Sequence, residues 1–196
     1  MKQTPQLPLE RCPHCNIARP LIHKQWGPIV THNHSGHCPR VWATYLCASC
    51  GGVILVCSIQ NQESPIAQLW PAPAEVAETV PARAREFLTQ AISSLSAPSG
   101  AVMLTASAVD AMLKDKGYKE GSLNSRIDSA AKDHLITAEM ATWAHEIRLE
   151  ANDQRHADEN AALPSATDAQ KVIEFATALA QFLYVLPARV ERGRKS

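Results

Sequence analysis

Residues 137–151 read TAEMATWAHEIRLEA, and their apolar side chains recur at the spacing of one face of an α-helix. The residues of that face are Met140, Trp143, Ala144, Ile147 and Ala151. Thr137 precedes the pattern, and its hydroxyl can accept a hydrogen bond from the first turn. We therefore predict a helix that begins after Thr137. Asn152-Asp153 is predicted to break it, because both side chains compete for backbone hydrogen bonds.

The same periodicity extends through the rest of the C-terminal part of the chain. Further helices are predicted at about 82–96, 101–116, 122–133 and 167–186. Pro98-Ser99-Gly100 is predicted to end the first of them. Five helices joined by short loops are typical of an up-and-down bundle, so the fold class is predicted to be mainly α.

The first 57 residues have a different composition. They hold all six cysteines and five of the eight histidines, with short β-type runs at 42–46 and 53–56. Residues 58–81 carry four prolines, which forbid a long helix. The predicted organisation is a small β-rich zinc ribbon at 1–57, a Pro-rich connector at 58–81 and a helical bundle at 82–196.

Two Cys-x-x-Cys motifs predict the metal site of this ribbon. Cys12 and Cys15 form the first, Cys47 and Cys50 form the second, and 31 residues separate the two motifs. Two residues between thiolates let one tight turn direct both sulfurs at one ion, and four thiolates complete a tetrahedral zinc site. Such a site has no open position, so the zinc would be structural. The alternatives are unrelated buried thiols or a redox pair.

Five further residues of the N-terminal part have a metal-binding character without a defined spacing. They are His32, His34, His37, Cys38 and Cys57. The histidines and Cys38 either form a second metal site or belong to a solvated loop with one packed thiol.

Composition excludes several classes of protein. Lys plus Arg and Asp plus Glu each number 19, so the chain is not a uniformly basic nucleic-acid coat protein. The first ten residues lack the apolar segment of a signal peptide, and no apolar run approaches membrane-spanning length. A cytoplasmic protein with no membrane partner is expected. The absence of a glycine-rich phosphate loop predicts no small-molecule cofactor.

A set of polar residues follows the helical stretch quoted above. His145, Arg148, Asn152 and His156 recur at intervals of three and four residues. Arg offers a planar fork of donors to a phosphate, and His moves protons near neutral pH. Asn152 can orient either of them. The alternative is a solvated face with ordinary ion pairs.

Several pieces of the sequence resemble the bacterial domain-of-unknown-function family 4145. The pieces are Pro81, Ala108–Lys114, Leu123–Ile127, Glu146-Ile147-Arg148 with Asn152 and His156, and Phe182–Pro187. The resemblance covers about 120 residues of bundle, and members of that family often carry an N-terminal zinc ribbon. It implies the all-helical HEPN superfamily, whose catalytic members are metal-independent ribonucleases that dimerise around an Arg and a following His. Here these would be Arg148 and His156, with seven residues between them.

Three functions follow from these expectations. The first is a nucleic-acid-associated module, RNA being the expected ligand, with Arg155 and the tail residues Arg189, Arg192 and Arg194 as phosphate contacts. The second is a metal-independent endoribonuclease in which His156 takes the 2′-hydroxyl proton at a homodimer cleft. The third is a non-catalytic protein-interaction dimer in a bacterial defence or mobile-element system.

Overall fold

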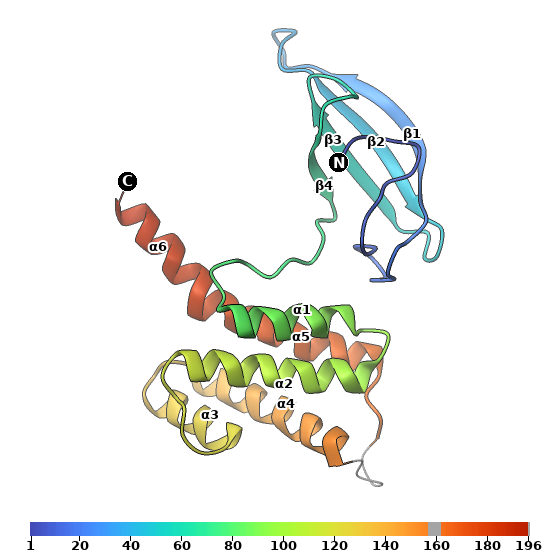
Figure 1. Cartoon of the computed structure of the whole chain (residues 1–196). Helices are drawn as coiled ribbons and strands as arrows, with labels where there is room; N and C mark the ends of the chain where they lie inside the picture. Colours follow the sequence, from blue (N-terminus) through green and yellow to red (C-terminus); the bar gives the residue numbers. More distant parts are fainter. Residues whose placement is uncertain (157–161, 196) are drawn as a thin grey trace. The chain divides into compact units, whose positions relative to one another are not determined.

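The computed structural model describes residues 1–156 and 162–195, and the chain divides into two units, Met1–Ala74 and Glu75–Ser196. Each unit has its own hydrophobic core. The first unit is a small antiparallel sheet and the second is helical (Figure 1). The prediction of a helical C-terminal part preceded by a small β-rich module is confirmed.

The sheet has four strands in the order of the sequence. They are β1 (Ile22–Thr31), β2 (Arg40–Cys47), β3 (Val53–Ile59) and β4 (Ile66–Trp70). Side chains of β2 alternate between buried and partly exposed, so the sheet has one covered and one open face. The N-terminal segment lies over the covered face, where the backbone N–H of Leu7 donates to the carbonyl of Ile22 at 2.9 Å. Leu7 and Tyr45 are fully buried there.

The predicted boundaries of the connector need correction. Residues 66–70 form β4, which pairs with β3, and the sheet unit extends to Ala74. Pro65 and Pro71 flank this strand and leave its interior free, and an edge strand tolerates such neighbours. The part of the predicted connector from Glu75 onward belongs to the helical unit, where Val80 is buried in the core.

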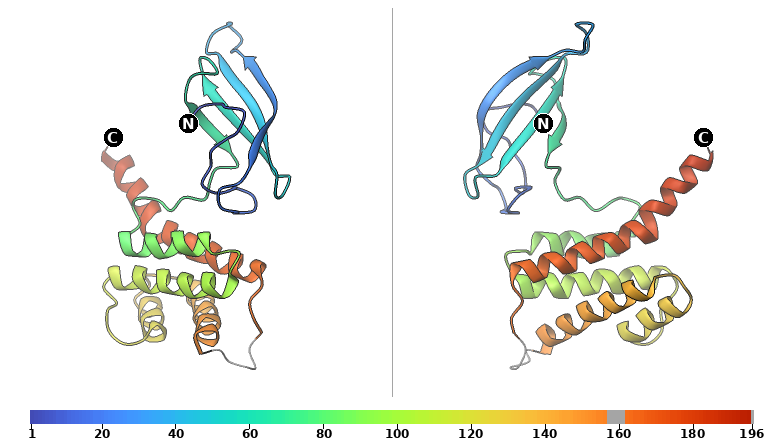
Figure 2. Two further views of the ribbon diagram at one scale, coloured as in Figure 1. Left: turned by 45° about the vertical axis from the view of Figure 1, so that its right-hand side comes forward. Right: turned by 180° about the vertical axis from the view of Figure 1, so that it is seen from behind.

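The helical unit is organised around one long helix, α2. Its helices are α1 (Ala82–Ser93), α2 (Pro98–Asp115), α3 (Leu123–Lys132), α4 (Ala138–His156), α5 (Ala166–Ala180), the π-helical turn η1 (Gln181–Val185) and α6 (Leu186–Lys195). Within this unit α2 lies between a layer of α1 and α5 and a layer of α3 and α4 (Figure 2). Phe175 and Met112 are among the fully buried side chains of this core.

Two predicted helix boundaries are wrong, one for a local reason and one because of core packing. Pro98 begins α2 and does not merely end the helix before it, because the first helical turn has no use for a proline's missing N–H. The predicted break at Asn152-Asp153 is absent, and α4 continues to His156. The packing of Ala151 and Ile147 in the core outweighs the local preference of Asn and Asp for turns.

The last helix also continues beyond its predicted end at residue 186. The N–H of Leu186 donates to the carbonyl of Gln181, five residues earlier, and Pro187 then lies inside a helix that runs to Lys195. The widened π turn lies directly before the proline, where an α-helix would otherwise lose a hydrogen bond and clash with the proline ring. No residue of α6 is buried.

Candidate functional site

The four cysteines of the two Cys-x-x-Cys motifs meet at one point of the sheet unit. The sulfur atoms of Cys12, Cys15, Cys47 and Cys50 all lie within 4.8 Å of one another, and those of Cys12 and Cys50 are 3.9 Å apart. Sulfurs bound to one zinc ion at about 2.3 Å stand roughly 3.8 Å apart in a tetrahedron. The donor set therefore has the size and chemistry of a metal site.

The turns around these cysteines direct backbone N–H groups at the sulfurs. The N–H of His14 donates to Cys12 Sγ at 3.4 Å, and the N–H of Gly52 donates to Cys50 Sγ at 3.4 Å. A Cβ atom at position 52 would stand 2.4 Å from the His14 ring, whose Nε2 lies 2.8 Å from the carbonyl oxygen of Val53. Glycine at position 52 therefore permits the close approach of the two motifs.

The thiols of this tetrad differ in their protonation. Burial raises the pKa of Cys12 to about 12. Burial also acts to raise the pKa of Cys47, but the N–H groups of Cys50 and Ser49 and the neighbouring thiols outweigh it and lower that pKa to about 7. Four thiolates this close repel one another, so a bound cation is what would allow all four to be charged.

The remaining cysteine and histidine candidates do not join this tetrad. Cys57 is buried in β3, whereas Cys38 is exposed in the loop that also holds His32, His34 and His37. Within the described residues, the metal-type cluster is the one formed by the four cysteines above. The structure therefore brings no second metal site together in this loop.

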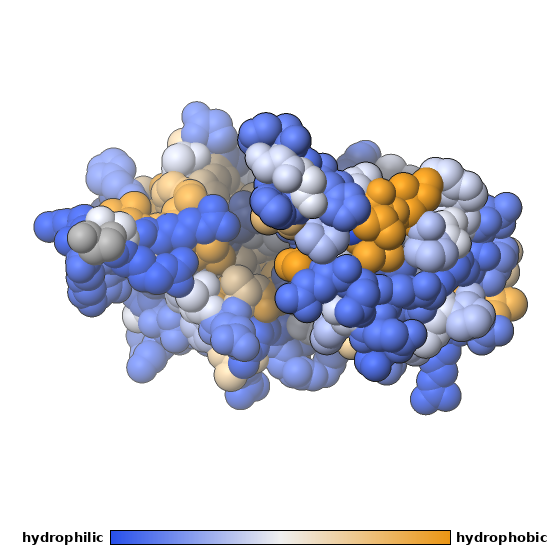
Figure 3. All heavy atoms as spheres, turned by 90° about the horizontal axis from the view of Figure 1, so that it is seen from above, coloured by the Kyte–Doolittle hydropathy of each residue, from blue (hydrophilic) through white to orange (hydrophobic). Residues whose placement is uncertain are grey.

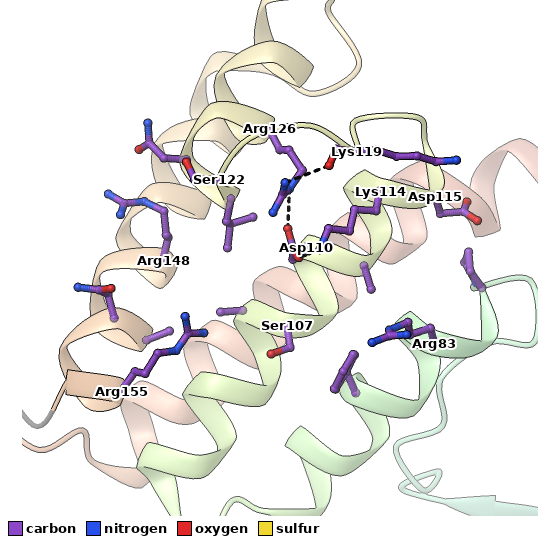
Figure 4. A pocket seen from close by; sticks show the side chains of 18 residues that line it. Arg83, Ser107, Asp110, Lys114, Asp115, Lys119, Ser122, Arg126, Arg148 and Arg155 are labelled. Carbon is purple, nitrogen blue, oxygen red and sulfur yellow. Dashed lines mark hydrogen bonds and ion pairs between the residues drawn. The ribbon is translucent and has the colours of Figure 1, made fainter.

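A second site is a polar groove of about 1000 Å³ in the helical unit (Figure 4). Side chains of α1, α2, α3 and α4 and of the loop before α3 line it. The charged residues of its lining are six cations and two carboxylates, namely Arg83, Lys114, Lys119, Arg126, Arg148, Arg155, Asp110 and Asp115. The surplus of positive charge suits an anionic ligand.

Arg126 connects the elements that form the walls of this groove. It is 8% exposed, its Nε donates to Asp110 Oδ1 at 2.7 Å, and its Nη1 donates to the carbonyl of Gly121. Lys114 pairs with the other oxygen of Asp110 at 2.6 Å. This network ties α3 and its preceding loop to α2, and it neutralises one of the two carboxylates (Figure 4). No spacing in the sequence indicates this network, although Asp110 and Arg126 both lie in the stretches that resemble family 4145.

Arg148 is the predicted catalytic residue that lies best for ligand binding. It lines the groove from α4, and its Nε is buried without a hydrogen-bond partner among the described residues. A buried donor on a charged group is costly unless something accepts its hydrogen. Arg155, two turns further along α4, extends in Figure 4 toward Ser107 of α2. Asn152 lines the groove between them.

His156 does not meet Arg148 within one chain. They are eight positions apart along an unbroken helix, which corresponds to a rise of about 12 Å and a rotation of roughly 80°. His156 is exposed and is not part of the groove lining. The break predicted at Asn152-Asp153 is absent, and the continuous α4 keeps the two side chains apart within one chain. His145 lies elsewhere, 3.0 Å from Asp128 of α3.

The predicted basic tail is separate from the groove. Arg189, Arg192 and Arg194 lie on α6, and none of the three lines the groove. Arg194 instead borders a more apolar hollow of about 870 Å³ with Phe182, Leu186 and Val190. The continuous helix Ala166–Lys195 is long and apolar enough to cross a membrane, but 44% of its most apolar stretch is buried within the protein. Core residues such as Phe175 and Leu179 supply part of its apolar character, and Phe182 and Leu186 are exposed.

Comparison with known proteins assigns most of the helical unit to a protein family. No curated protein and no solved structure matches the chain. A family model described as a domain of unknown function, DUF4145, matches residues 88–196, which is more than half of the chain and includes α2 to α6. The matched region holds most of the groove lining, and the cysteine tetrad lies outside it. The chain therefore belongs to the DUF4145 family.

Proposed function

We propose that the helical unit binds RNA through the phosphate backbone, in the groove between α2 and α4. The observation that carries this proposal is Arg148, whose buried Nε lacks an acceptor at the wall of a groove with six cations and two carboxylates. A phosphate oxygen is the acceptor that a guanidinium fork matches best. The groove offers such a ligand a surplus of cations, among them the guanidinium of Arg148.

The neutral lining supports RNA as the form of nucleic acid. Ser107, Ser122, Asn124 and Asn152 place hydroxyl and amide groups among the cations. Such groups donate to and accept from the 2′-hydroxyl, which distinguishes RNA from DNA. Two exposed side chains of this lining, Asn124 and Asn152, come from α3 and α4 respectively.

The metal of the cysteine tetrad is proposed to be zinc in a structural role. Four sulfur ligands at tetrahedral spacing select zinc or iron, and a closed four-ligand set leaves no position for a substrate. In this role the ion would replace part of the core that a small sheet cannot provide. Metal analysis of purified protein should find about one zinc ion per chain.

The binding proposal is tested with a labelled 20-nucleotide single-stranded RNA. Arg148→Ala should weaken binding by at least about tenfold, since a hydrogen bond to a charged group contributes roughly 1.5–3 kcal/mol. The matched control is Arg85→Ala, an arginine of α1 that does not line the groove. Equal affinities of wild type and Arg148→Ala would refute the proposal. Single-stranded DNA of the same sequence should bind more weakly than RNA.

The ribonuclease alternative stays a hypothesis. It requires a second copy of the chain to bring His156 to Arg148, because one helix holds the two apart. Incubation of RNA with the protein in EDTA tests it directly. Cleavage that is lost in both Arg148→Ala and His156→Ala would favour the nuclease, and intact RNA at concentrations that saturate binding favours a non-catalytic module.

A further inference from the structure

The open face of the sheet carries three of the four tryptophans of the chain. Trp26 of β1 pairs with Thr44 of β2, and Thr44 and Trp42 lie on the face opposite the buried Ala43 and Tyr45. Paired residues of neighbouring strands point to the same side of a sheet. Trp26 and Trp42 therefore share the open face.

Trp70 completes this set from the other edge of the sheet. It pairs with Leu55, and Leu55 pairs with Thr44, so one row crosses the sheet from Trp26 on β1 to Trp70 on β4. Three strand spacings of about 4.8 Å separate the ends of this row by roughly 14 Å. We call Trp26, Trp42 and Trp70 the tryptophan face.

Two rings of this face stack on each other, and Trp26 and Trp70 are exposed to solvent. Trp42 and Trp70 stack with their ring centroids 5.9 Å apart, and Trp42 Nε1 donates to Thr31 Oγ1 at 2.8 Å. Trp26 is 61% exposed and Trp70 is 40% exposed. Much of the surface seen from above is hydrophilic, with hydrophobic residues in separate patches (Figure 3). Exposed tryptophans on one rigid face are a costly feature that a ligand would explain.

The charges of the sheet unit indicate an anionic ligand. None of the four strands contains Asp or Glu, while Arg40 and His23 are exposed on the strands themselves. Arg40 Nη1 lies 4.0 Å from Cys57 Sγ, which places the guanidinium beside the strand that runs beneath the tryptophan face. The unit as a whole has five Lys and Arg residues and two Glu, of which Glu63 pairs with Lys2 at 3.6 Å.

We propose that the tryptophan face binds single-stranded nucleic acid, with unpaired bases stacked on Trp26 and Trp70 and the backbone near Arg40. Aromatic side chains offer every base a stacking partner, and nearby cations track the phosphates. A carbohydrate would also stack on tryptophan, but it gains nothing from the surplus of cations. All residues of this site belong to the sheet unit, and the proposal does not depend on the groove of the helical unit.

The test uses the full chain with Trp143→Phe, which removes the one tryptophan of the helical unit and leaves three reporters on the tryptophan face. Titration with a 12-nucleotide oligouridylate should quench the remaining fluorescence. Oligothymidylate should quench it as well, whereas a blunt duplex of equal length should not, because its bases are already stacked. Arg85→Ala, which lies outside both the groove lining and the tryptophan face, is the control and should leave this quenching in place.

Affinity for the oligothymidylate, which the groove is expected to bind more weakly than RNA, provides the second measurement. Trp26→Ala with Trp70→Ala should weaken binding of the dodecamer by at least about 30-fold, given the cost of losing two stacking partners. Trp26→Phe with Trp70→Phe should retain most of the affinity, because a ring remains. Metal content and circular dichroism check that each variant is folded. An absence of quenching, or unchanged affinity of the folded alanine variant, overturns the proposal. A changed oligomeric state of that variant without a change in nucleic-acid binding would instead identify the face as a protein contact, and also overturns it.

Discussion

The sheet unit and the helical unit have hydrophobic cores of very different size and composition. The buried cluster of the sheet unit contains eight residues, two of which, Cys12 and Cys47, belong to the cysteine tetrad. The cluster of the helical unit contains 27 buried residues and no cysteine. Small domains seldom bury enough apolar surface to fold without a staple. The comparison indicates that a metal bound by the tetrad would replace part of a core in the sheet unit, so removal of the metal and disruption of the helical core should act on different units.

Metal removal should produce the largest effect. Chelation, or Cys47→Ser, should unfold the sheet unit, since structural zinc contributes roughly 10–16 kcal/mol of apparent binding energy in small domains. Fluorescence of the tryptophan face should shift to that of solvated indole, while helical circular dichroism persists. Cys38→Ser, an exposed cysteine outside the tetrad, is the control. The proposal that the sheet unit needs metal to fold would be contradicted if tryptophan emission stayed unchanged after complete removal of the metal.

The reverse experiment targets the helical core. Phe175 is fully buried on α5, and its ring centroid lies 4.9 Å from that of Trp143. Phe175→Ala should lower the free energy of unfolding of the helical unit by about 3–5 kcal/mol, because it removes apolar contacts and leaves a cavity. Chemical denaturation followed by helical circular dichroism measures this loss. Zinc stoichiometry should not change, and Phe182→Ala, at an exposed position, should cost much less. A loss of bound metal in Phe175→Ala would show that the two units fold as one.

A smaller effect is expected at the start of α5. The Ser165 hydroxyl accepts from the N–H of Asp168, and the Asp168 carboxylate accepts from the N–H of Ser165, which is a capping box. Ser165→Ala should lower the free energy of unfolding of the helical unit by about 1 kcal/mol at neutral pH. Ser93→Ala, the last residue of α1, is a control without this cap. Equal stability of the Ser165 variant and wild type at neutral pH would contradict the assigned cap.

The same cap predicts a pH dependence. Hydrogen bonds from the side chain and backbone of Ser165 hold the pKa of Asp168 below its ordinary value of 3.8. Because the folded pKa is the lower one, this contribution is fully present above pH 4 and is lost as the pH falls through the depressed value. The difference between wild type and Ser165→Ala should therefore shrink in acid. A difference that stays constant down to pH 2 would exclude the contribution of the carboxylate.

Most of the fold was predictable from periodicity and cysteine spacing. The apolar residues spaced along one helix face from Met140 to Ala151 predict α4. The two Cys-x-x-Cys motifs meet as expected. The misplaced boundaries have different causes, since core packing overrides the local signal at Asn152-Asp153, whereas Pro98 suits the first turn of a helix. Pro98 was predicted to end a helix, yet it starts α2, and the last helix continues past its predicted end at residue 186 through a π turn before Pro187.

The sites were less predictable than the fold. Spacing along α4 identified Arg148, but whether its Nε is buried and unpaired depends on packing between helices. The Asp110–Arg126 pair joins residues 16 positions apart and carries no periodic signal. The tryptophan face arises from strand register, and no local pattern places Trp26 and Trp70 in one row. Sequence therefore indicates residue types, whereas register and packing decide which of them meet.

The central functional claim is that the groove around Arg148 binds RNA. The salt dependence of RNA binding tests this claim most directly. A plot of log affinity against log salt concentration has a slope of about −0.7 for each phosphate contacted on a single strand. Arg148→Ala with Arg155→Ala should make this slope shallower by about 1.4, while Arg85→Ala should leave it unchanged. If the double variant binds RNA with the affinity and the slope of wild type, the groove is not where this protein holds its ligand.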